Sequence, residues 1–122
     1  MIKGTGIDII EIQRIKEAME KNPRFLLRIF TPDENKLFHQ AKYRPNMVAG
    51  FFAAKEAFAK ALGTGIREFK WRDIEVSKDP AGRPFIKLHN NAKNIAYSKD
   101  IRDIHLSISH SKEYAIAQVI VL

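Results

Sequence analysis

Two carboxylates and a lysine have the residue types that phosphate chemistry with a hard metal ion requires. Asp8 lies near the N-terminus of the 122-residue chain, and Glu56 and Lys60 lie four residues apart near its middle. Mg²⁺ prefers carboxylate oxygens and keeps several water ligands beside substrate phosphates. Lys60 has the charge to neutralise one phosphate, and Ser109 and His110 have hydrogen-bond donors for another. None of these residues is specific alone.

Asp8 and the Glu56–Lys60 pair each have a structural interpretation as well. Asp8 and Glu11 have the spacing of a capping box, in which Asp8 would be the N-cap of a helix that continues to about Lys21. Glu56 and Lys60 share one face of a helix and would form a weak, solvated ion pair. The local pattern alone leaves both alternatives open.

Several other catalytic chemistries are disfavoured by the residues that they need. Ser109 and His110 are neighbours in an expected strand, so their side chains point to opposite faces, and no G-x-S-x-G pattern occurs. The four histidines lack the H-E-x-x-H spacing of a zinc site. No Walker A or G-x-G-x-x-G pattern occurs, and Gly63-Thr64-Gly65 is too short to count as a phosphate loop.

The composition also bears on the compartment. The chain has no cysteine, which removes disulfides and thiolate nucleophiles and fits a reducing cytosol. No run of about 18 apolar residues occurs, and the N-terminus lacks the cleavage pattern of a signal peptide. We therefore expect no membrane span and a cytoplasmic location.

Two expected secondary-structure elements must bring the candidate site residues together. A long helix from about Pro45 to Leu62 carries Glu56 and Lys60. Proline suits its first turn, and Gly63 suits the left-handed residue that follows its end. A strand over residues 2–10 carries the N-terminal carboxylate. Because the long helix is rich in alanine and has a broad apolar face, we expect it at the centre of the fold.

The remaining pattern predicts helices first and strands afterwards. Helix starts are expected at Asn22-Pro23 and at Thr31-Pro32, the second with a capping box and continuing to about Lys42. Strand-like alternation at residues 71–77 is followed by a turn at 79–82, a strand at 85–88, a short helix at 90–99 and strands at 105–109 and 114–122. The last strand is apolar on both faces, which predicts a central or an interface position. The fold class is therefore α+β, with the N-terminal strand and helices packed on a mainly antiparallel sheet, in one domain over residues 1–122.

The charge favours an anionic partner, because the chain carries a net charge of +7 and has a pI near 9.8. Arg14, Arg24 and Arg28 lie on the first two expected helices around Phe25. They predict either a solvated basic surface with Phe25 turned inward, or a docking site with a polar rim and an aromatic anchor. A small basic nucleic-acid-binding module would explain the charge equally well. It would not explain the two carboxylates, and no recognisable motif of that class occurs.

Three stretches of the chain form a distinctive set: Gly6–Asp8, Phe52–Gly65 with the sequence FAAKEAFAKALGTG, and Leu106–His110 with the sequence LSISH. In order, spacing and chain length they resemble the signatures of the holo-acyl-carrier-protein synthases, the short 4′-phosphopantetheinyl transferases. The resemblance covers essentially the whole sequence, and it implies the fold of that family.

The resemblance implies transfer of the 4′-phosphopantetheine arm of coenzyme A to a serine of apo acyl carrier protein, with release of adenosine 3′,5′-bisphosphate. Asp8 and Glu56 match the positions that bind Mg²⁺ in the family, and Glu56 also matches the group that helps to deprotonate the serine. Positions that match coenzyme A contacts are Lys60, Gly63 and Thr64 at the pyrophosphate and Gly82, Arg83, Pro84, Ser109 and His110 at the nucleotide end. The family is typically homotrimeric with active sites between subunits. Its basic first helices dock the acidic carrier protein, and the matching candidates are Arg14, Arg24, Phe25 and Arg28.

Two positions depart from the pattern of that family. The family commonly has Gly-Arg-Phe-Ala before its Lys-Glu pair, whereas this chain has Gly50-Phe51-Phe52-Ala53, so a cation is missing at Phe51. Ala81 stands where asparagine is frequent. Both departures concern the nucleotide end of the expected site and leave the metal site unchanged.

Overall fold

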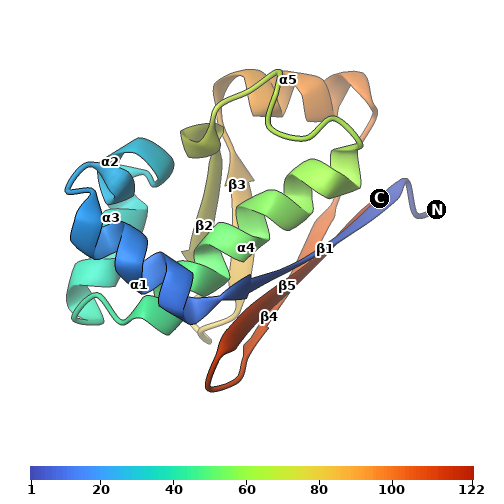
Figure 1. Ribbon diagram of the computed structural model, residues 1–122. Helices are drawn as coiled ribbons and strands as arrows, with labels where there is room; N and C mark the ends of the chain where they lie inside the picture. Colours follow the sequence, from blue (N-terminus) through green and yellow to red (C-terminus); the bar gives the residue numbers. More distant parts are fainter.

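A long helix, α4 (Pro45–Leu62), runs through the centre of the computed structural model, which describes residues 1–122 (Figure 1). Its bounds are those predicted. Pro45 is in the first turn, where a missing N–H is harmless, and Gly63 follows the helix with a left-handed φ of 78°. Small alanines let neighbouring elements approach the helix closely, and most of its residues are buried.

One face of α4 is covered by a three-stranded antiparallel sheet of β1 (Gly4–Glu11), β5 (Tyr114–Val121) and β4 (Ile104–His110), in that spatial order. Asp8 pairs with Ala117, and Ala117 pairs with Ile108. The final strand is therefore central, as its apolar sequence predicted. Ala115, Ala117 and Val119 are fully buried on the face toward α4, and the alternate residues of the sheet point away from it.

Glycines allow β1 to lie directly on α4. A Cβ atom at Gly6 would overlap the carbonyl oxygen of Ala57, and one at Gly4 would overlap that of Ala61. The backbones of the strand and the helix are thus in contact without an intervening side chain. This contact sets the position of Asp8, two residues after Gly6, against the second half of α4.

A two-stranded hairpin, β2 (Ile74–Lys78) and β3 (Pro84–Leu88), follows α4 and precedes α5 (Asn90–Ser98). Its turn is shaped by Asp79, whose Oδ1 accepts from the backbone N–H groups of Ala81 and Arg83, both at 2.9 Å. The strand predicted from residue 71 begins only at Ile74, because residues 71–73 form a 3₁₀ turn, η1 (Trp71–Asp73). The Asp73 carboxylate caps that turn by accepting from the N–H of Lys70.

Three short helices, α1 (Ile12–Lys21), α2 (Phe25–Ile29) and α3 (Pro32–Gln40), gather around the start of α4 (Figure 1). The capping box of α3 is present as predicted, with Glu34 N–H donating to Thr31 and Thr31 N–H donating to Glu34. The helix ends at Gln40 and not at residue 42, because Lys42 and Tyr43 both have left-handed φ values.

Two predicted helix starts are wrong. Asp8 is not an N-cap, because it is paired in the β1–β5 ladder and α1 begins only after Glu11. Asn22 ends α1, and its side chain accepts from Arg24 N–H in the turn before α2. The second helix accordingly starts at Phe25 and not at Pro23.

The core is continuous from the N-terminal helices through α4 to the sheet, and it contains one fully buried ion pair. Lys55 Nζ donates to Glu34 Oε1 at 2.7 Å and to the carbonyl oxygens of Trp71 and Ile74. No helix is both long enough and apolar enough to cross a bilayer. The arrangement confirms the predicted α+β class with antiparallel sheets.

Candidate functional site

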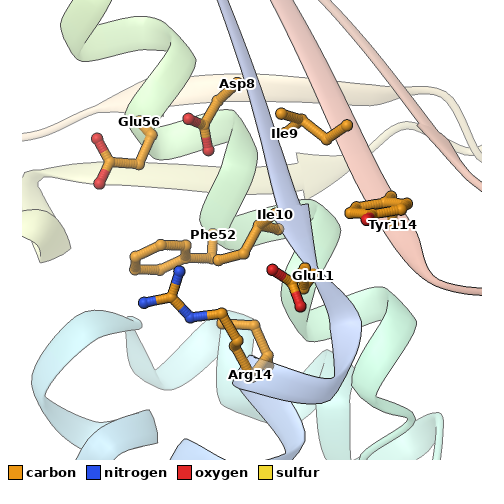
Figure 2. Close-up of a pocket in the computed structure, with 9 residues that line it drawn as sticks. Asp8, Ile9, Ile10, Glu11, Arg14, Phe52, Glu56 and Tyr114 are labelled. Carbon is orange, nitrogen blue, oxygen red and sulfur yellow. The ribbon is translucent and has the colours of Figure 1, made fainter.

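A pocket of about 520 Å³ opens between β1, the start of α1 and α4 (Figure 2). Asp8 reaches from β1 toward α4, where Glu56 lies, and Phe52 lies one turn before Glu56 on the same helix (Figure 2). Glu11, Arg14 and Tyr114 line the part of the pocket farther from Asp8 and Glu56. The structure therefore brings Asp8 and Glu56, which are 48 residues apart in sequence, into one pocket.

Lys60 completes a group of three charged side chains at the same position. Its Nζ donates to Asp8 Oδ1 at 3.1 Å and to the carbonyl oxygen of Ile7 at 3.0 Å. The Asp8 side chain is only 17% exposed, whereas that of Lys60 is 53% exposed. The ion pair that the sequence suggested between Glu56 and Lys60 is absent, and Lys60 pairs with Asp8 instead.

The electrostatic environment changes the acidity of Glu56. Burial raises the pKa of its carboxyl group, the negative charge of Asp8 raises it further, and the positive charge of Lys60 partly opposes both. A carboxylate whose pKa moves toward neutrality is a better proton acceptor at physiological pH than an ordinary glutamate.

Asp8 and Glu56 fit a divalent metal ion with few protein ligands. No group of three histidine, aspartate, glutamate or cysteine side chains is placed to hold a metal. Two half-buried carboxylates with unfavourable mutual repulsion are the donor set, so most coordination positions would be left for water and phosphate oxygens. That is the mode of binding which Mg²⁺ prefers.

Gly63 and Thr64 lie just beyond Lys60, at the C-terminal end of α4. Gly63 N–H donates to the Lys60 carbonyl oxygen, and Thr64 Oγ1 donates to the carbonyl oxygen of Gly65. Because carbonyl groups make this helix end electronegative, an anion here would need the ammonium group of Lys60.

The residues expected at the nucleotide end line other pockets. Gly82, Pro84 and His110 border a pocket of about 320 Å³ next to the start of α4. Arg83 and Pro84 border a neighbouring pocket of about 480 Å³ with residues of β4. None of these residues lines the pocket of Asp8 and Glu56.

The sheet itself separates Asp8 from Ser109. Asp8 is on the face of β1 toward α4, since its neighbours Ile7 and Ile9 point outward and are 61% and 59% exposed. Ser109 on β4 pairs with Ile116 and is on the outer face. Asp8 and Ser109 thus lie on opposite sides of one sheet and cannot contact one ligand within a single chain.

One of the basic residues expected to dock a partner, Arg14, lines the carboxylate pocket. Arg24, directly before α2, and Arg28, on α2, are exposed. Phe25 is half-buried and packs against Phe52, with ring centroids 6.4 Å apart. Phe25 is therefore turned inward, which was the structural alternative, yet it supports the aromatic wall of the pocket.

Phe51, where the expected cation is missing, packs into the core. It is 2% exposed, and its ring centroid is 5.1 Å from that of Phe38. Ala81 is exposed in the turn of the hairpin.

Two cations that were not predicted, Arg44 and Lys78, line the same pocket as Phe51. Arg44 directly precedes the longest helix, a position at which the helix N-terminus favours anions, and this signal was present in the sequence.

Known proteins resemble the chain over its whole length. The family model of the 4′-phosphopantetheinyl transferase superfamily matches residues 4–119. A holo-[acyl-carrier-protein] synthase of Alkaliphilus metalliredigens is 65% identical over 120 residues, which cover 98% of each chain.

Solved structures give the same result. A holo-[acyl-carrier-protein] synthase from Neisseria meningitidis has a TM-score of 0.92 at 36% identity, covering 100% of this chain and 99% of that one. The Helicobacter pylori enzyme, solved in complex with coenzyme A, has a TM-score of 0.85 at 39% identity, covering 97% and 99%. The expected fold family is thereby confirmed.

Proposed function

Because the chain belongs to the holo-[acyl-carrier-protein] synthase family of 4′-phosphopantetheinyl transferases, we propose that it transfers the 4′-phosphopantetheine group of coenzyme A to a serine of apo acyl carrier protein. Its membership makes it a transferase enzyme. The reaction depends on Mg²⁺ and releases adenosine 3′,5′-bisphosphate in this proposal.

The observation that carries the proposal is the convergence of Asp8, Glu56 and Lys60. Carboxylates from β1 and α4 line one pocket, and the ammonium group of Lys60 contacts one of them, Asp8, at 3.1 Å. Transfer of a phosphate-linked group requires charge neutralisation and alignment more than covalent help from the protein. This trio has both the anionic ligands for a metal and a cation for the leaving group.

Each residue has a distinct role in the proposed reaction. Asp8 and Glu56 would hold Mg²⁺, which when bound polarises the attacked phosphate and stabilises the charge of the leaving nucleotide. Glu56, with its raised pKa, accepts the proton of the serine hydroxyl directly or through water. Lys60 and the Gly63-Thr64 turn bind the pyrophosphate of coenzyme A.

The nucleotide end of coenzyme A is bound by a neighbouring subunit in this proposal. Gly82, Arg83, Pro84, Ser109 and His110 would contribute from that subunit, since they lie away from Asp8 within one chain. The outer sheet face carries the exposed isoleucines 7, 9 and 116, as expected for an interface between copies. A closed homotrimer would cover that face and repeat the site three times.

The acidic carrier protein docks beside the carboxylate pocket, on Arg14, Arg24 and Arg28, with Phe25 supporting the pocket wall. The net charge of +7 steers both anionic substrates toward the enzyme. The holo carrier protein would serve fatty acid biosynthesis, and we expect the reaction in the cytoplasm.

Mass spectrometry of an apo carrier protein tests the proposal. Incubation with this protein, coenzyme A and Mg²⁺ should add one phosphopantetheine group to a serine. The same mixture with a chelator, or with the Asp8→Asn variant, should leave the carrier protein unmodified. An unmodified carrier protein in the complete reaction would contradict the function, and full modification in the presence of chelator would contradict the metal requirement.

A further inference from the structure

Lys60 contacts one oxygen of the Asp8 carboxylate, which is one of the two proposed metal ligands. Its ammonium group contacts Asp8 Oδ1 at 3.1 Å and the Ile7 carbonyl oxygen at 3.0 Å. These are the two hydrogen bonds of the ammonium group within the chain, and the Asp8 carboxylate accepts no other hydrogen bond. The positive charge that balances Asp8 in the free chain is therefore that of Lys60.

The two partners differ in their freedom to move. Asp8 is held in a paired strand with its side chain 17% exposed, whereas the Lys60 side chain is 53% exposed near the end of α4. Lysine has a flexible four-carbon stem and three donors that can be redirected. Lys60 can leave Asp8 without any change in backbone, but Asp8 cannot follow it.

A metal ion on the Asp8 carboxylate competes with Lys60 at either oxygen: at Oδ1 it would displace the ammonium group, and at Oδ2 it would repel the ammonium group across the carboxylate. A divalent cation bound there would repel the ammonium group at contact distance, and Lys60 would need another anionic partner. The pyrophosphate expected beside Gly63 and Thr64, one turn farther along α4, is such a partner.

We propose that Lys60 is a positioning residue that holds the Asp8 carboxylate in the free enzyme and exchanges it for substrate phosphate when the divalent ion binds. This inference rests on the proposed function. It makes binding of the metal and of coenzyme A mutually favourable, since each removes an obstacle to the other. Such coupling is reciprocal by thermodynamic necessity.

The inference is tested by measuring the affinity of the enzyme for Mn²⁺ in the absence of coenzyme A. The electron paramagnetic resonance signal of free Mn²⁺ reports how much of the ion is unbound. The Lys60→Met variant should bind Mn²⁺ roughly 2- to 5-fold more tightly than the unmodified enzyme. The gain is small because the competing Lys60–Asp8 ion pair is partly exposed to solvent and therefore weak. Lys60→Arg keeps the competing charge and should stay within about 2-fold of the unmodified enzyme. Lys36→Met removes the same charge from an exposed site on α3 and should leave the affinity unchanged.

Coenzyme A gives a second readout. It should increase the Mn²⁺ affinity of the unmodified enzyme by a larger factor than that of Lys60→Met, because release of Lys60 contributes to the coupling only when Lys60 is present.

The inference is overturned if Lys60→Met binds Mn²⁺ with equal or lower affinity, or if Lys60→Arg tightens binding as much as Lys60→Met does. If the carrier protein is still modified in those cases, the proposed function stands and the exchange alone is wrong. If the unmodified enzyme neither binds Mn²⁺ nor modifies the carrier protein, both fail. Circular dichroism of each variant distinguishes a change in affinity from a loss of fold.

Discussion

The Glu56 carboxylate lies half-buried on α4, beside Asp8 and one helical turn from Lys60. Burial and the charge of Asp8 raise its pKa above the ordinary value of 4.5. The folded chain therefore holds more protons at this position than the unfolded chain as the pH rises above 4.5, and folding stability declines through that window. At neutral pH the ionised Glu56 makes the fold less stable, while its basicity favours proton abstraction.

Replacing Glu56 with glutamine should separate these two effects. In chelator at pH 7, Glu56→Gln should raise the free energy of unfolding, by less than about 1 kcal/mol because solvent screens this half-exposed group. Transfer activity should fall by roughly 10²- to 10⁴-fold with the loss of the base. Urea unfolding at pH 7 and below pH 4.5 checks the sign, since the gain should vanish in acid, where wild-type Glu56 is protonated.

Glu20→Gln on the exposed side of α1 is the matched control and should change neither quantity. A Glu56→Gln variant that is less stable than the unmodified protein at pH 7 would show that the carboxylate is stabilised by its surroundings, against the present reasoning.

Arg28 is exposed on α2, the helix whose Phe25 packs against Phe52, so charge reversal there should weaken docking of an acidic protein. Arg28→Glu should raise KM for the carrier protein about tenfold at low salt, with little change in KM for coenzyme A. The effect should shrink as ionic strength increases, because exposed charges are screened. Steady-state kinetics against each substrate measure it, with Lys93→Glu on α5 as control. An equal change in both KM values would exclude a docking role.

At the scale of elements, the contact between β1 and α4 determines the geometry of the site. Gly6 brings the strand backbone against the Ala57 carbonyl, and Asp8 follows two residues later. A larger residue at position 6 would push the strand outward and increase the distance between Asp8 and α4.

Gly6→Ala should therefore cost roughly 1–3 kcal/mol of folding stability, as overpacking commonly does. Activity should fall further than the folded fraction explains, because Asp8 moves away from Glu56 and Lys60. Gly50→Ala is a control for folding stability alone, because Gly50 lines the pocket of Gly82 and His110. Its Cβ would meet a side-chain methyl of Ile108 at 2.9 Å, and that side chain can adjust. Chemical unfolding compares the stability of the two variants, and turnover of Gly6→Ala is measured where it is folded. An equal loss of stability in both variants would contradict a special role for Gly6.

The buried pair of Glu34 and Lys55 connects α3, α4 and β2. Glu34 also accepts from the N–H of Val76, so this carboxylate has partners from three elements. Desolvation raises the pKa of Glu34 and lowers that of Lys55, and the attraction between the two groups opposes both shifts.

Removing one partner should be far more damaging than removing both charges. Lys55→Met should cost about 3–5 kcal/mol, since it leaves Glu34 buried without a cation. Adding Glu34→Gln to that variant should cost less than the sum of the two single changes. A double-mutant cycle measured by urea unfolding gives the coupling, and additive effects would show that the pair contributes no interaction of its own.

Local rules predicted the elements best where several signals agreed. Pro45, the alanine-rich face and Gly63 together predicted α4 correctly, and Thr31 with Glu34 predicted the start of α3. Prediction failed where a partner distant in sequence determines the backbone conformation. Asp8 has the spacing of a cap, but pairing with β5 keeps it extended, and no local pattern contains that information. Trp71 likewise continues a strand-like alternation, although Asp73 closes a turn there.

The site was predictable to a similar extent. Asp8 and Glu56 line one pocket, while their roles stay predictions. The Lys60–Asp8 contact depends on the register of β1 against α4 and was not predicted. Arg44 and Lys78 enter their pocket from separate elements, so their proximity to His110 follows only from the folded chain.

At the scale of the whole molecule, the candidate residues fall into separate sets. Asp8 and Ser109 lie on opposite faces of the sheet, while Arg83 and His110 line pockets apart from that of Asp8 and Glu56. A ligand that contacts both Asp8 and Ser109 would therefore have to lie between two copies of the chain.

Mixed oligomers test this division directly. Glu56→Gln removes one half of the site, and the double variant Arg83→Ala/His110→Ala removes the other, so each should be nearly inactive alone. If sites form between subunits, refolding the two variants together should recover about a quarter of wild-type activity, because random assortment joins two intact halves at that frequency in a closed oligomer. Mixing Asp8→Asn with Glu56→Gln, which damage the same half, should recover nothing. If the first mixture also stays inactive while size-exclusion chromatography shows mixed oligomers, the complete site must lie within one chain. Ser109 would then be excluded from the site, because the sheet separates it from Asp8.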